Sequence, residues 1–300
     1  MKPFIQRHSL LSYFALTFGI TWGSILTLLA TRGFNFAAIG MPDVMLMFLF
    51  MLLGPSISGL LLTGRLEGRQ GVRELWQRQT RWRIGIQWYA VALFTVPVLL
   101  LSILSFLRFI VSPSFAPGFE IVGLMIGLMA GGLEEIGWTG FATPRLLRRY
   151  NPFRAGLLLG LVWALWHMLA DYAGNIATMA LTDWLTWAVL FWVLPLSAYR
   201  ILMTWVYSRT HSLLVAQLMH ASYTGWLLVL SPAISFAESP LWQIIFTASL
   251  WALVAAVGFF YRSSRGEARP TAPRGVRHIT FLSRHSHTLR KNTRHPPQHA

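Results

Sequence analysis

The sequence contains no cysteine. This absence excludes disulfide bonds and a thiolate nucleophile, and it leaves His and carboxylate side chains as the available ligands for a metal ion. Charged residues are also scarce, because they make up 12% of the 300 residues, whereas soluble globular domains carry about 25%. The chain is therefore too poor in charge to be a soluble protein of this size.

Hydrophobic residues take the place of the missing charge. They make up 55% of the sequence, and the mean hydropathy is +0.52. Eight apolar runs are each long enough to cross a hydrocarbon core of roughly 30 Å as a helix. We therefore predict an all-α fold, a polytopic transmembrane helical bundle of about eight spans: residues 10–30, 44–63, 88–111, 119–141, 153–172, 184–206, 213–230 and 241–261.

Basic residues are concentrated in alternate loops between these runs. Arg-rich segments follow the second and fourth runs, Arg200 and Arg209 mark one end of the sixth, and the segments after the fifth and seventh contain no Lys or Arg. Because basic loops stay in the cytoplasm, we predict a multi-pass protein of the cell membrane with both termini cytoplasmic. Within the basic loop after the second run, residues 72–80 are predicted to form an amphipathic surface helix.

The distribution of charge also predicts the domain organisation. Residues 1–261 form one membrane domain, and residues 262–300 form a basic tail with nine Lys and Arg residues against one Glu. We predict that the tail is disordered and held near anionic lipid by its charge. Membrane topology accounts for the net charge of +15, so we predict a lipid bilayer and no nucleic acid as partner. The oligomeric state stays open.

Two adjacent carboxylates, Glu134 and Glu135, stand inside the fourth apolar run. An acid near the bilayer centre costs roughly 2.5–3.5 kcal/mol, so such residues face the bundle interior and are functional by default. His167 and His220 lie at a similar depth to Glu134, since each is 11 to 13 residues from the nearest Arg of a basic cluster, or roughly 16–20 Å along a helix. We predict one polar site formed by Glu134, His167 and His220, open toward the cytoplasmic half.

Small and aromatic residues near these positions predict how the helices pack. Gly127 and Gly131 recur at four-residue spacing before Glu135, and Gly156 and Gly160 recur in the same way in the fifth run, so both helices offer a face for close packing. Trp163 is four residues before His167 and shares its helical face, where it would fix the imidazole. A proton relay, a metal site, a catalytic site and an interhelical hydrogen-bond ladder all agree with this pattern.

At these residues the sequence resembles the CAAX prenyl protease and bacteriocin-processing (CPBP) family of intramembrane proteases. The family's Glu-Glu-x-x-x-Arg helix corresponds to residues 134–139, its aromatic-x-x-x-His helix to 163–167 and its His-x-x-x-Asn helix to 220–224. The likeness covers about residues 54–225. It implies an intramembrane endopeptidase that acts on an unidentified membrane-associated protein or peptide.

The resemblance implies roles for the individual residues. Glu134 and His167 would activate a water, while His220 and Thr224 would stabilise the oxyanion. Alternatively, Glu134, His167 and His220 would bind a catalytic Zn with Glu135 as the base, which would make the chain a metalloprotease. The His-Glu-x-x-His pattern of common zinc proteases is absent, so a metal site would have to be assembled across helices.

Two positions depart from the family motifs. The motif Arg is Thr139 and the final Asn is Thr224. We expect the first change to remove a guanidinium that would hold Glu135 ionised. We expect the second to weaken the oxyanion donor, because a helical Thr hydroxyl often bonds the carbonyl four residues earlier, here that of His220. The rival interpretation is a non-catalytic family member that binds membrane partners or confers immunity, or a small proton-coupled transporter.

Overall fold

A computed structural model describes residues 2–175, 179–235 and 238–266. Every regular element in these ranges is helical, which confirms the predicted all-α fold. Short 3₁₀ turns, η1 (Phe36–Ala38) and η2 (Pro113–Phe115), lie in two of the loops. Of the tail predicted to be disordered, residues 262–266 are helical and continue the last helix, which corrects the prediction for this part. Residues 267–300 lie outside the described residues, and for them disorder stays a prediction.

Helices occupy all eight predicted apolar runs. Six helical segments of the described chain are long and apolar enough to cross a membrane: α2 (Ser9–Thr31), α3 (Met41–Gln79), α4 (Ile86–Ile110), α7 (Pro152–Asn175), the continuous segment of α8 (Leu181–Ala188), η4 (Val189–Val193) and α9 (Leu194–Thr210), and α11 (Ser239–Gly266). The other two, α5 (Val122–Gly137) and α10 (Leu213–Val229), are shorter. These two short helices carry the Glu pair and His220.

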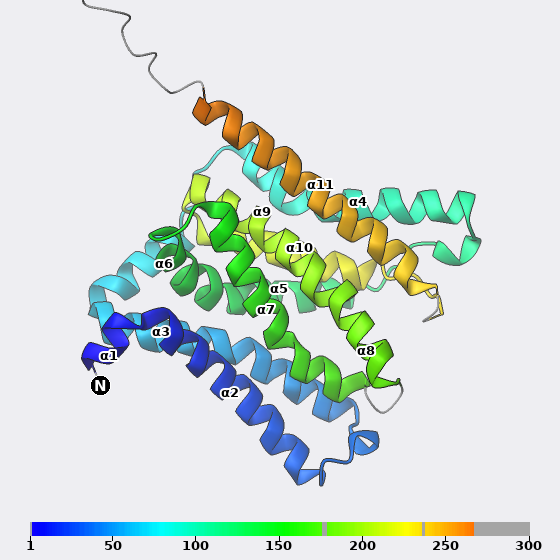
Figure 1. Ribbon diagram of the computed structural model, residues 1–300, viewed down its shortest axis with the longest axis horizontal. Coiled ribbons are helices and arrows are strands. Elements are labelled where there is room, and N and C mark those ends of the chain that lie inside the picture. Colours follow the sequence, from blue (N-terminus) through cyan, green and yellow to red (C-terminus); the bar gives the residue numbers. More distant parts are fainter. Residues whose placement is uncertain (1, 176–178, 236–237, 267–300) are drawn as a thin grey trace, which may run out of the picture. The chain divides into compact units, whose positions relative to one another are not determined.

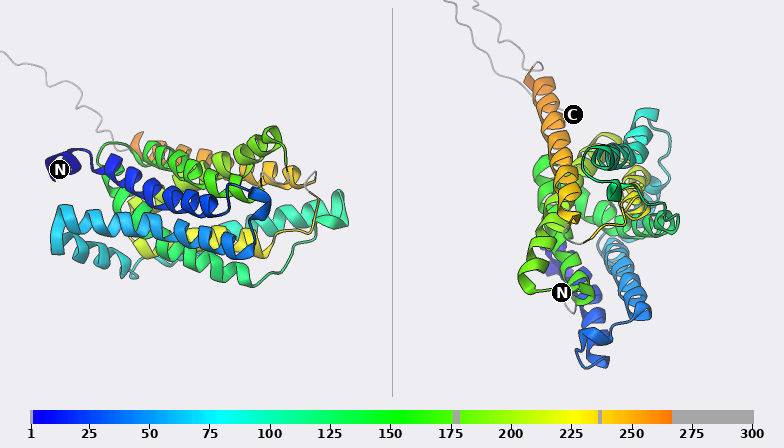
Figure 2. Two further views of the ribbon diagram at one scale, coloured as in Figure 1. Left: turned by 90° about the horizontal axis from the view of Figure 1, so that it is seen from below. Right: turned by 90° about the vertical axis from the view of Figure 1, so that its right-hand side faces the viewer.

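Within residues 2–260 the helices lie side by side as a bundle (Figures 1 and 2). The most extensive helix contact joins α5 and α10. On its other side α5 packs against α3, and α10 also packs against α4 and α9, while α7 lies along α9. The fourth, fifth, sixth and seventh runs therefore share one interior, as a common site requires.

Glycine allows the site-bearing helices to approach closely. A Cβ at Gly127 or Gly131 of α5 would overlap the backbone of α10, and a Cβ at Gly156 or Gly160 of α7 would overlap the backbone of α9. These contacts confirm the two small-residue faces predicted from the four-residue spacing. They hold α5 against α10 and α7 against α9 at distances that larger side chains would prevent.

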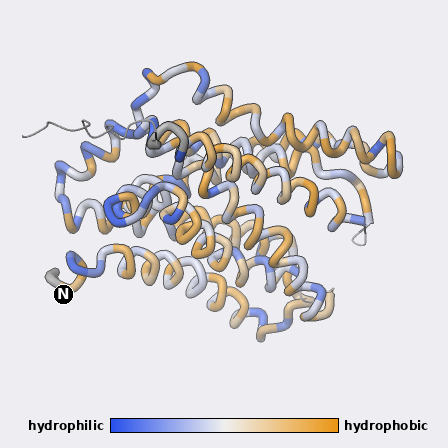
Figure 3. Tube along the Cα trace, turned by 45° about the horizontal axis from the view of Figure 1, so that its top comes forward, coloured by the Kyte–Doolittle hydropathy of each residue, from blue (hydrophilic) through white to orange (hydrophobic). Residues whose placement is uncertain are grey.

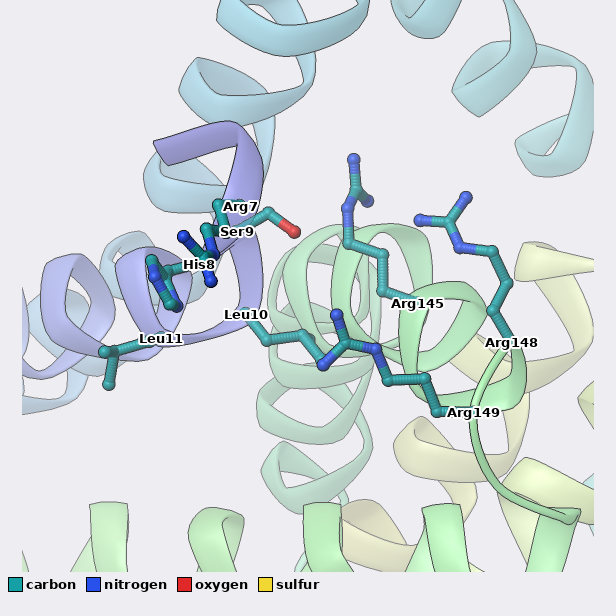
Figure 4. Close-up of a pocket in the computed structure, with 8 residues that line it drawn as sticks. All are labelled: Arg7, His8, Ser9, Leu10, Leu11, Arg145, Arg148 and Arg149. Atoms are coloured by element: carbon teal, nitrogen blue, oxygen red, sulfur yellow. The ribbon is translucent and has the colours of Figure 1, made fainter. Parts of the chain in front are cut away.

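The basic clusters gather at one end of the bundle. Arg145 of α6 (Thr143–Leu147) pairs with Glu67 of α3 at 2.5 Å. A cavity of about 250 Å³ is bordered by Arg7, the last residue of α1 (Lys2–Arg7), and by Arg145, Arg148 and Arg149 (Figure 4). Large hydrophilic stretches lie at this end, beside the N-terminal residues, and apolar residues dominate the spans (Figure 3). The loops that the charge alternation assigns to one side therefore do lie together.

The second span extends further than the sequence predicts. α3 continues to Gln79, with one break at Gly68, whose φ of 63° is favourable for glycine. The helix predicted at residues 72–80 is thus present as far as Gln79, and it follows the span across the kink at Gly68. At its end the amide of Gln79 donates to the side chain of Gln217 on α10 at 2.6 Å. This hydrogen bond ties the basic end of α3 to the helix that carries His220.

Candidate active site

The Glu pair ends α5 directly before a π-helical turn, η3 (Trp138–Ala142). Both the N–H and the hydroxyl of Thr143 donate to the carbonyl of Trp138, five residues earlier, which fixes this wider turn. The second π-helical turn in the described chain, η4, carries Trp192, which stacks on His167. Single π turns inside α-helices occur frequently at functional sites, and both of these border the same group of side chains.

Glu134 lies at the centre of this group. Its side chain is 3% exposed, and the indole Nε1 of Trp163 donates to Glu134 Oε2 at 3.3 Å. Glu134 Oε1 accepts no hydrogen bond from the residues that the structure describes. One carboxylate oxygen is therefore anchored while the other is available to a bound molecule.

The imidazole of His167 is held in one orientation. Its Nδ1 lies 2.8 Å from the carbonyl oxygen of Trp163. Since a carbonyl only accepts hydrogen bonds, Nδ1 carries the proton, and the neutral ring keeps its lone pair on Nε2. The ring stacks on Trp192 with centroids 4.3 Å apart, and Trp163 and Trp166 meet it edge-on. This arrangement confirms the prediction that Trp163 fixes the imidazole.

His220 is anchored by the second acid of the pair. Its Nδ1 lies 2.8 Å from Glu135 Oε1, and both side chains are buried. The carboxylate accepts, so Nδ1 donates and Nε2 is free for a substrate. A carboxylate that holds the far nitrogen of an imidazole fixes its tautomer and its direction. Glu135 therefore lies behind His220 and supports it.

Arg200 lies at the site and not at the end of its span. It was predicted to mark the cytoplasmic end of the sixth span, but it is fully buried in α9, where both terminal nitrogens donate to Glu135 at 2.8 Å. The hydroxyl of Thr139 also donates to Glu135. The expectation that Glu135 lacks a guanidinium is thus wrong. Long Arg side chains near span ends commonly reach for the interface, and only the close α7–α9 packing shows that this one points inward.

One cavity of about 470 Å³ collects the predicted catalytic groups. Glu134, His167, His220 and Thr224 all line it. In the described part of the chain, no hydrogen bond joins the Thr224 hydroxyl to the carbonyl of His220, so the expected loss of this donor is not observed. The structure therefore brings together four of the five predicted site residues around one space, with Glu135 behind them.

The cavity extends away from the basic end of the bundle. From the polar groups it reaches Ser231 after α10 and Trp242 near the start of α11. The predicted opening toward the half that carries the basic loops is therefore wrong. The physical reason is that the end of α3 covers the basic side, where Gln79 bonds Gln217 and Leu75 lies against Gly140.

The predicted Zn ligands do not form a ligand set in this arrangement. Within residues 2–175, 179–235 and 238–266, no group of three His, Asp or Glu side chains is spaced to hold one metal ion. Glu134, His167 and His220 share the cavity, but they do not converge on one point at ligand distance. We therefore derive no chemistry through a metal.

A carboxylate and two imidazoles with free Nε2 atoms, enclosed in an apolar bundle, have the composition of a hydrolytic site within a membrane. A family model described as Type II CAAX prenyl endopeptidase Rce1-like matches residues 116–226, which include the Glu pair, His167, Arg200, His220 and Thr224. CAAX prenyl protease 2 of Methanococcus maripaludis is 27% identical over 224 residues, covering 69% of this chain and 80% of the relative.

These similarities define the class of protein as an intramembrane endopeptidase. The family-model match covers the residues that carry the chain's motifs, and both matches confirm its resemblance to the CPBP family. The non-catalytic and transporter interpretations are not favoured by these matches.

Proposed function

We propose that the chain cleaves a peptide bond close to a lipid-modified C-terminus, with Glu134 and His167 activating the water and His220 and Thr224 stabilising the oxyanion. One observation carries this proposal. Two imidazoles, each anchored through Nδ1, line the same cavity as a carboxylate with one unpartnered oxygen. General-base catalysis and oxyanion stabilisation require such a set of groups.

The proposed reaction begins when Glu134 accepts a proton from a water that His167 orients through Nε2. The water oxygen bonds the peptide carbon, and the negative charge that develops on the carbonyl oxygen is met by His220 Nε2–H and the Thr224 hydroxyl. To donate there, His220 carries a proton on both nitrogens, with Nδ1–H bonded to Glu135 and Nε2–H directed at the negative oxygen. The carbon–nitrogen bond then breaks as Glu134 returns its proton to the leaving nitrogen.

The cavity supports a lipid-modified substrate. The name of the archaeal relative assigns prenylated substrates to that protein, and in this chain the space beyond the polar groups is mostly apolar, lined among others by Phe48, Met51, Ile126, Phe191 and Leu227. Its volume of about 470 Å³ falls within the range of about 300–1,000 Å³ for ligand sites. An isoprenoid chain would bury its surface there instead of in the bilayer.

A polar group in the same cavity supports recognition of a peptide. Gln243 of α11 is 2% exposed, and its Nε2 has no hydrogen-bond partner among the described residues. An unpaired buried amide costs free energy unless a ligand satisfies it. We therefore assign Gln243 as a donor to a carbonyl or carboxylate oxygen of the bound peptide.

A cleavage assay with purified protein tests the proposed function. Wild type and Glu134→Gln would be compared on a farnesylated fluorogenic peptide and on the same peptide without the lipid. We expect wild type to cleave the farnesylated peptide at least about tenfold faster, because the lipid contributes binding energy, and Glu134→Gln to cleave neither. Equal cleavage of both peptides would contradict lipid recognition, and full activity of Glu134→Gln would contradict the assigned base.

The metal alternative is tested in the same assay. We expect chelators to leave cleavage unchanged, since the proposed water is activated by side chains alone. Reversible loss with chelator and recovery with Zn²⁺ would instead support the ligand set of Glu134, His167 and His220 and would overturn the metal-free mechanism.

We also propose that the basic end faces the cytoplasm, because Arg-rich loops favour that side and these loops lie together in the bundle. Both termini would then be cytoplasmic. Reporter fusions at Gln70 and Ser264 should report the cytoplasmic side, and a fusion at Asn175 the external side. An external Gln70 would contradict this orientation.

A further inference from the structure

The family motif places an Arg four residues after the second Glu, and this chain has Thr139 there. The Thr139 side chain still points at Glu135 and bonds it. The guanidinium that would come from this position comes instead from Arg200, which lies 65 residues from Glu135 in sequence and on another helix. The same chemical contact is therefore made from a different place in the fold.

We propose that Arg200 is a positioning residue that replaces the missing motif Arg and keeps Glu135 in the state and orientation that hold His220. The proposal rests on the proposed role of His220 as an oxyanion donor. Arg200 does not line the cavity, so it acts on the reaction through Glu135 and His220 and does not touch the substrate.

The geometry around Glu135 is that of a fully occupied carboxylate. Oε1 accepts from an Arg200 nitrogen and from His220 Nδ1, each at 2.8 Å, and Oε2 accepts from the other Arg200 nitrogen at 2.8 Å and from Thr139. Bidentate guanidinium–carboxylate pairs fix direction as well as charge. With four donors in place, the Glu135 carboxylate has little freedom to rotate. The hydrogen bond from His220 Nδ1 to this carboxylate therefore fixes the orientation of the imidazole.

The neighbouring helix is shaped to receive Arg200. The guanidinium carbon lies 4.0 Å from the ring centroid of Trp163, an arrangement that attracts a cation. Gly160 of α7 lies against the Arg200 Cβ, where a larger residue would crowd it. Trp163 also bonds Glu134 and His167. One residue therefore supports Arg200 and two of the proposed catalytic groups: its indole contacts Arg200 and donates to Glu134, and its backbone carbonyl accepts from His167.

The two possible Arg positions exclude each other. The Arg200 guanidinium and the Thr139 hydroxyl share Glu135 Oε2, and all three side chains are buried. A second guanidinium at position 139 would meet a like charge beside one carboxylate. If Arg200 has taken over the motif role, an Arg at position 139 should be harmful beside Arg200 and helpful in its absence.

An exchange experiment tests this inference in the full-length protein. Cleavage would be measured for Arg200→Ala, Thr139→Arg, the double variant Thr139→Arg with Arg200→Ala, and a matched control, Thr139→Met with Arg200→Ala. We expect Arg200→Ala to lower kcat on the order of 10²-fold, by analogy with other groups that orient a catalytic His, with KM within about twofold because Arg200 is outside the cavity.

The expected signature is rescue by charge. Thr139→Arg alone should lower kcat, whereas the double variant should recover at least about tenfold over Arg200→Ala, and the Met control should not. A wild-type kcat in Arg200→Ala would overturn the inference, because Arg200 would then have no role in catalysis. Equal recovery in Thr139→Met with Arg200→Ala would also overturn it, because filling the space would then suffice without a charge. Arg200→Lys keeps the charge but loses the bidentate contact with the carboxylate, and we expect a kcat between wild type and Arg200→Ala.

Thermal unfolding in detergent provides a readout that needs no substrate. Arg200→Ala should lower Tm because it leaves Glu135 buried without its partner, and Thr139→Arg should restore part of the loss where Thr139→Met does not. If the wild type cleaves no peptide, the proposed function is wrong. The Tm values then still decide whether an Arg introduced by Thr139→Arg can replace Arg200. Absence of charge-specific Tm recovery would overturn the exchange.

Discussion

Two Arg–Glu pairs in this bundle differ in their surroundings. Arg200 and Glu135 are both 0% exposed and are joined by two hydrogen bonds of 2.8 Å, whereas Arg145 is 7% exposed and pairs with Glu67, which is 38% exposed, through one contact of 2.5 Å. Burial lowers the pKa of Arg145 to about 10, with Glu67 opposing the shift, so this cation is still charged at neutral pH.

The Arg200–Glu135 pair lies inside the site, whereas the Arg145–Glu67 pair lies near the surface at the basic end, and the two differ in what solvates a charge that loses its partner. Water or lipid headgroups can solvate the partly exposed Glu67 if Arg145 is lost, and Arg145 keeps its hydrogen bond to the carbonyl of Phe141 if Glu67 is lost, so this pair contributes little. No solvent reaches Glu135, and the loss of either partner there leaves a buried charge uncompensated. The chain therefore depends on the inner pair for both stability and the orientation of His220.

The largest expected effect comes from breaking each pair by the same change. Glu135→Gln should destabilise the protein by about 3–5 kcal/mol because Arg200 is left as a lone buried cation. Glu67→Gln should cost only about 1 kcal/mol, because Arg145 keeps its hydrogen bond to the carbonyl of Phe141 and its place over the Phe141 ring. Unfolding of both variants in the same detergent measures the contrast, and equal destabilisation would remove the distinction between the two pairs.

A smaller effect is expected from a comparison of two threonines, one in the cavity and one near the basic end. Thr224 lines the cavity, while the hydroxyl of Thr210 near the basic end bonds the carbonyl of Val206 at 3.0 Å. Thr224→Val should lower kcat by about 10²-fold, a usual cost for losing an oxyanion donor. Thr210→Val should leave kcat unchanged. If Thr224→Val cleaves at the wild-type rate, Thr224 has no part in oxyanion stabilisation.

Two glutamines provide a third comparison. Gln243→Leu should raise KM about tenfold with kcat retained, because it removes one substrate hydrogen bond of about 1.5 kcal/mol. Gln79→Leu, at the basic end, should leave KM unchanged because Gln79 bonds Gln217 and does not line the cavity. Steady-state kinetics on one peptide separates these outcomes. A lower kcat with constant KM in Gln243→Leu would show that Gln243 acts in the chemical step and not in substrate binding.

The smallest effect is expected at the basic end itself. Arg148→Gln combined with Arg149→Gln should leave kcat and KM within about twofold, because neither residue lines the catalytic cavity and exposed charges contribute little to stability. The variant is assayed in detergent, where membrane topology no longer matters. A loss of kcat as large as that of Thr224→Val would show that this end communicates with the site.

Much of the site was predictable because its chemistry violates the rules for lipid-facing residues. Glu134, His167 and His220 stand out in apolar runs, and their similar distances from the Arg clusters predicted that they meet. Arg200 did not stand out in this way. It lies toward the end of its span, where a cation is ordinary, so its position along the chain carried no sign of its buried partner.

The sequence by itself determined the apolar runs, the small-residue faces and the identity of the reactive groups, because these depend on composition and on helical periodicity. Only the tertiary structure decided which helix supplies the guanidinium, that Glu135 supports His220 from outside the cavity, and that the cavity extends away from the basic end. The physical reason is that local periodicity places a side chain on one face of its own helix. Which partner it meets depends on how closely α7 approaches α9 and α5 approaches α10, and those distances are set by contacts between residues far apart in the chain.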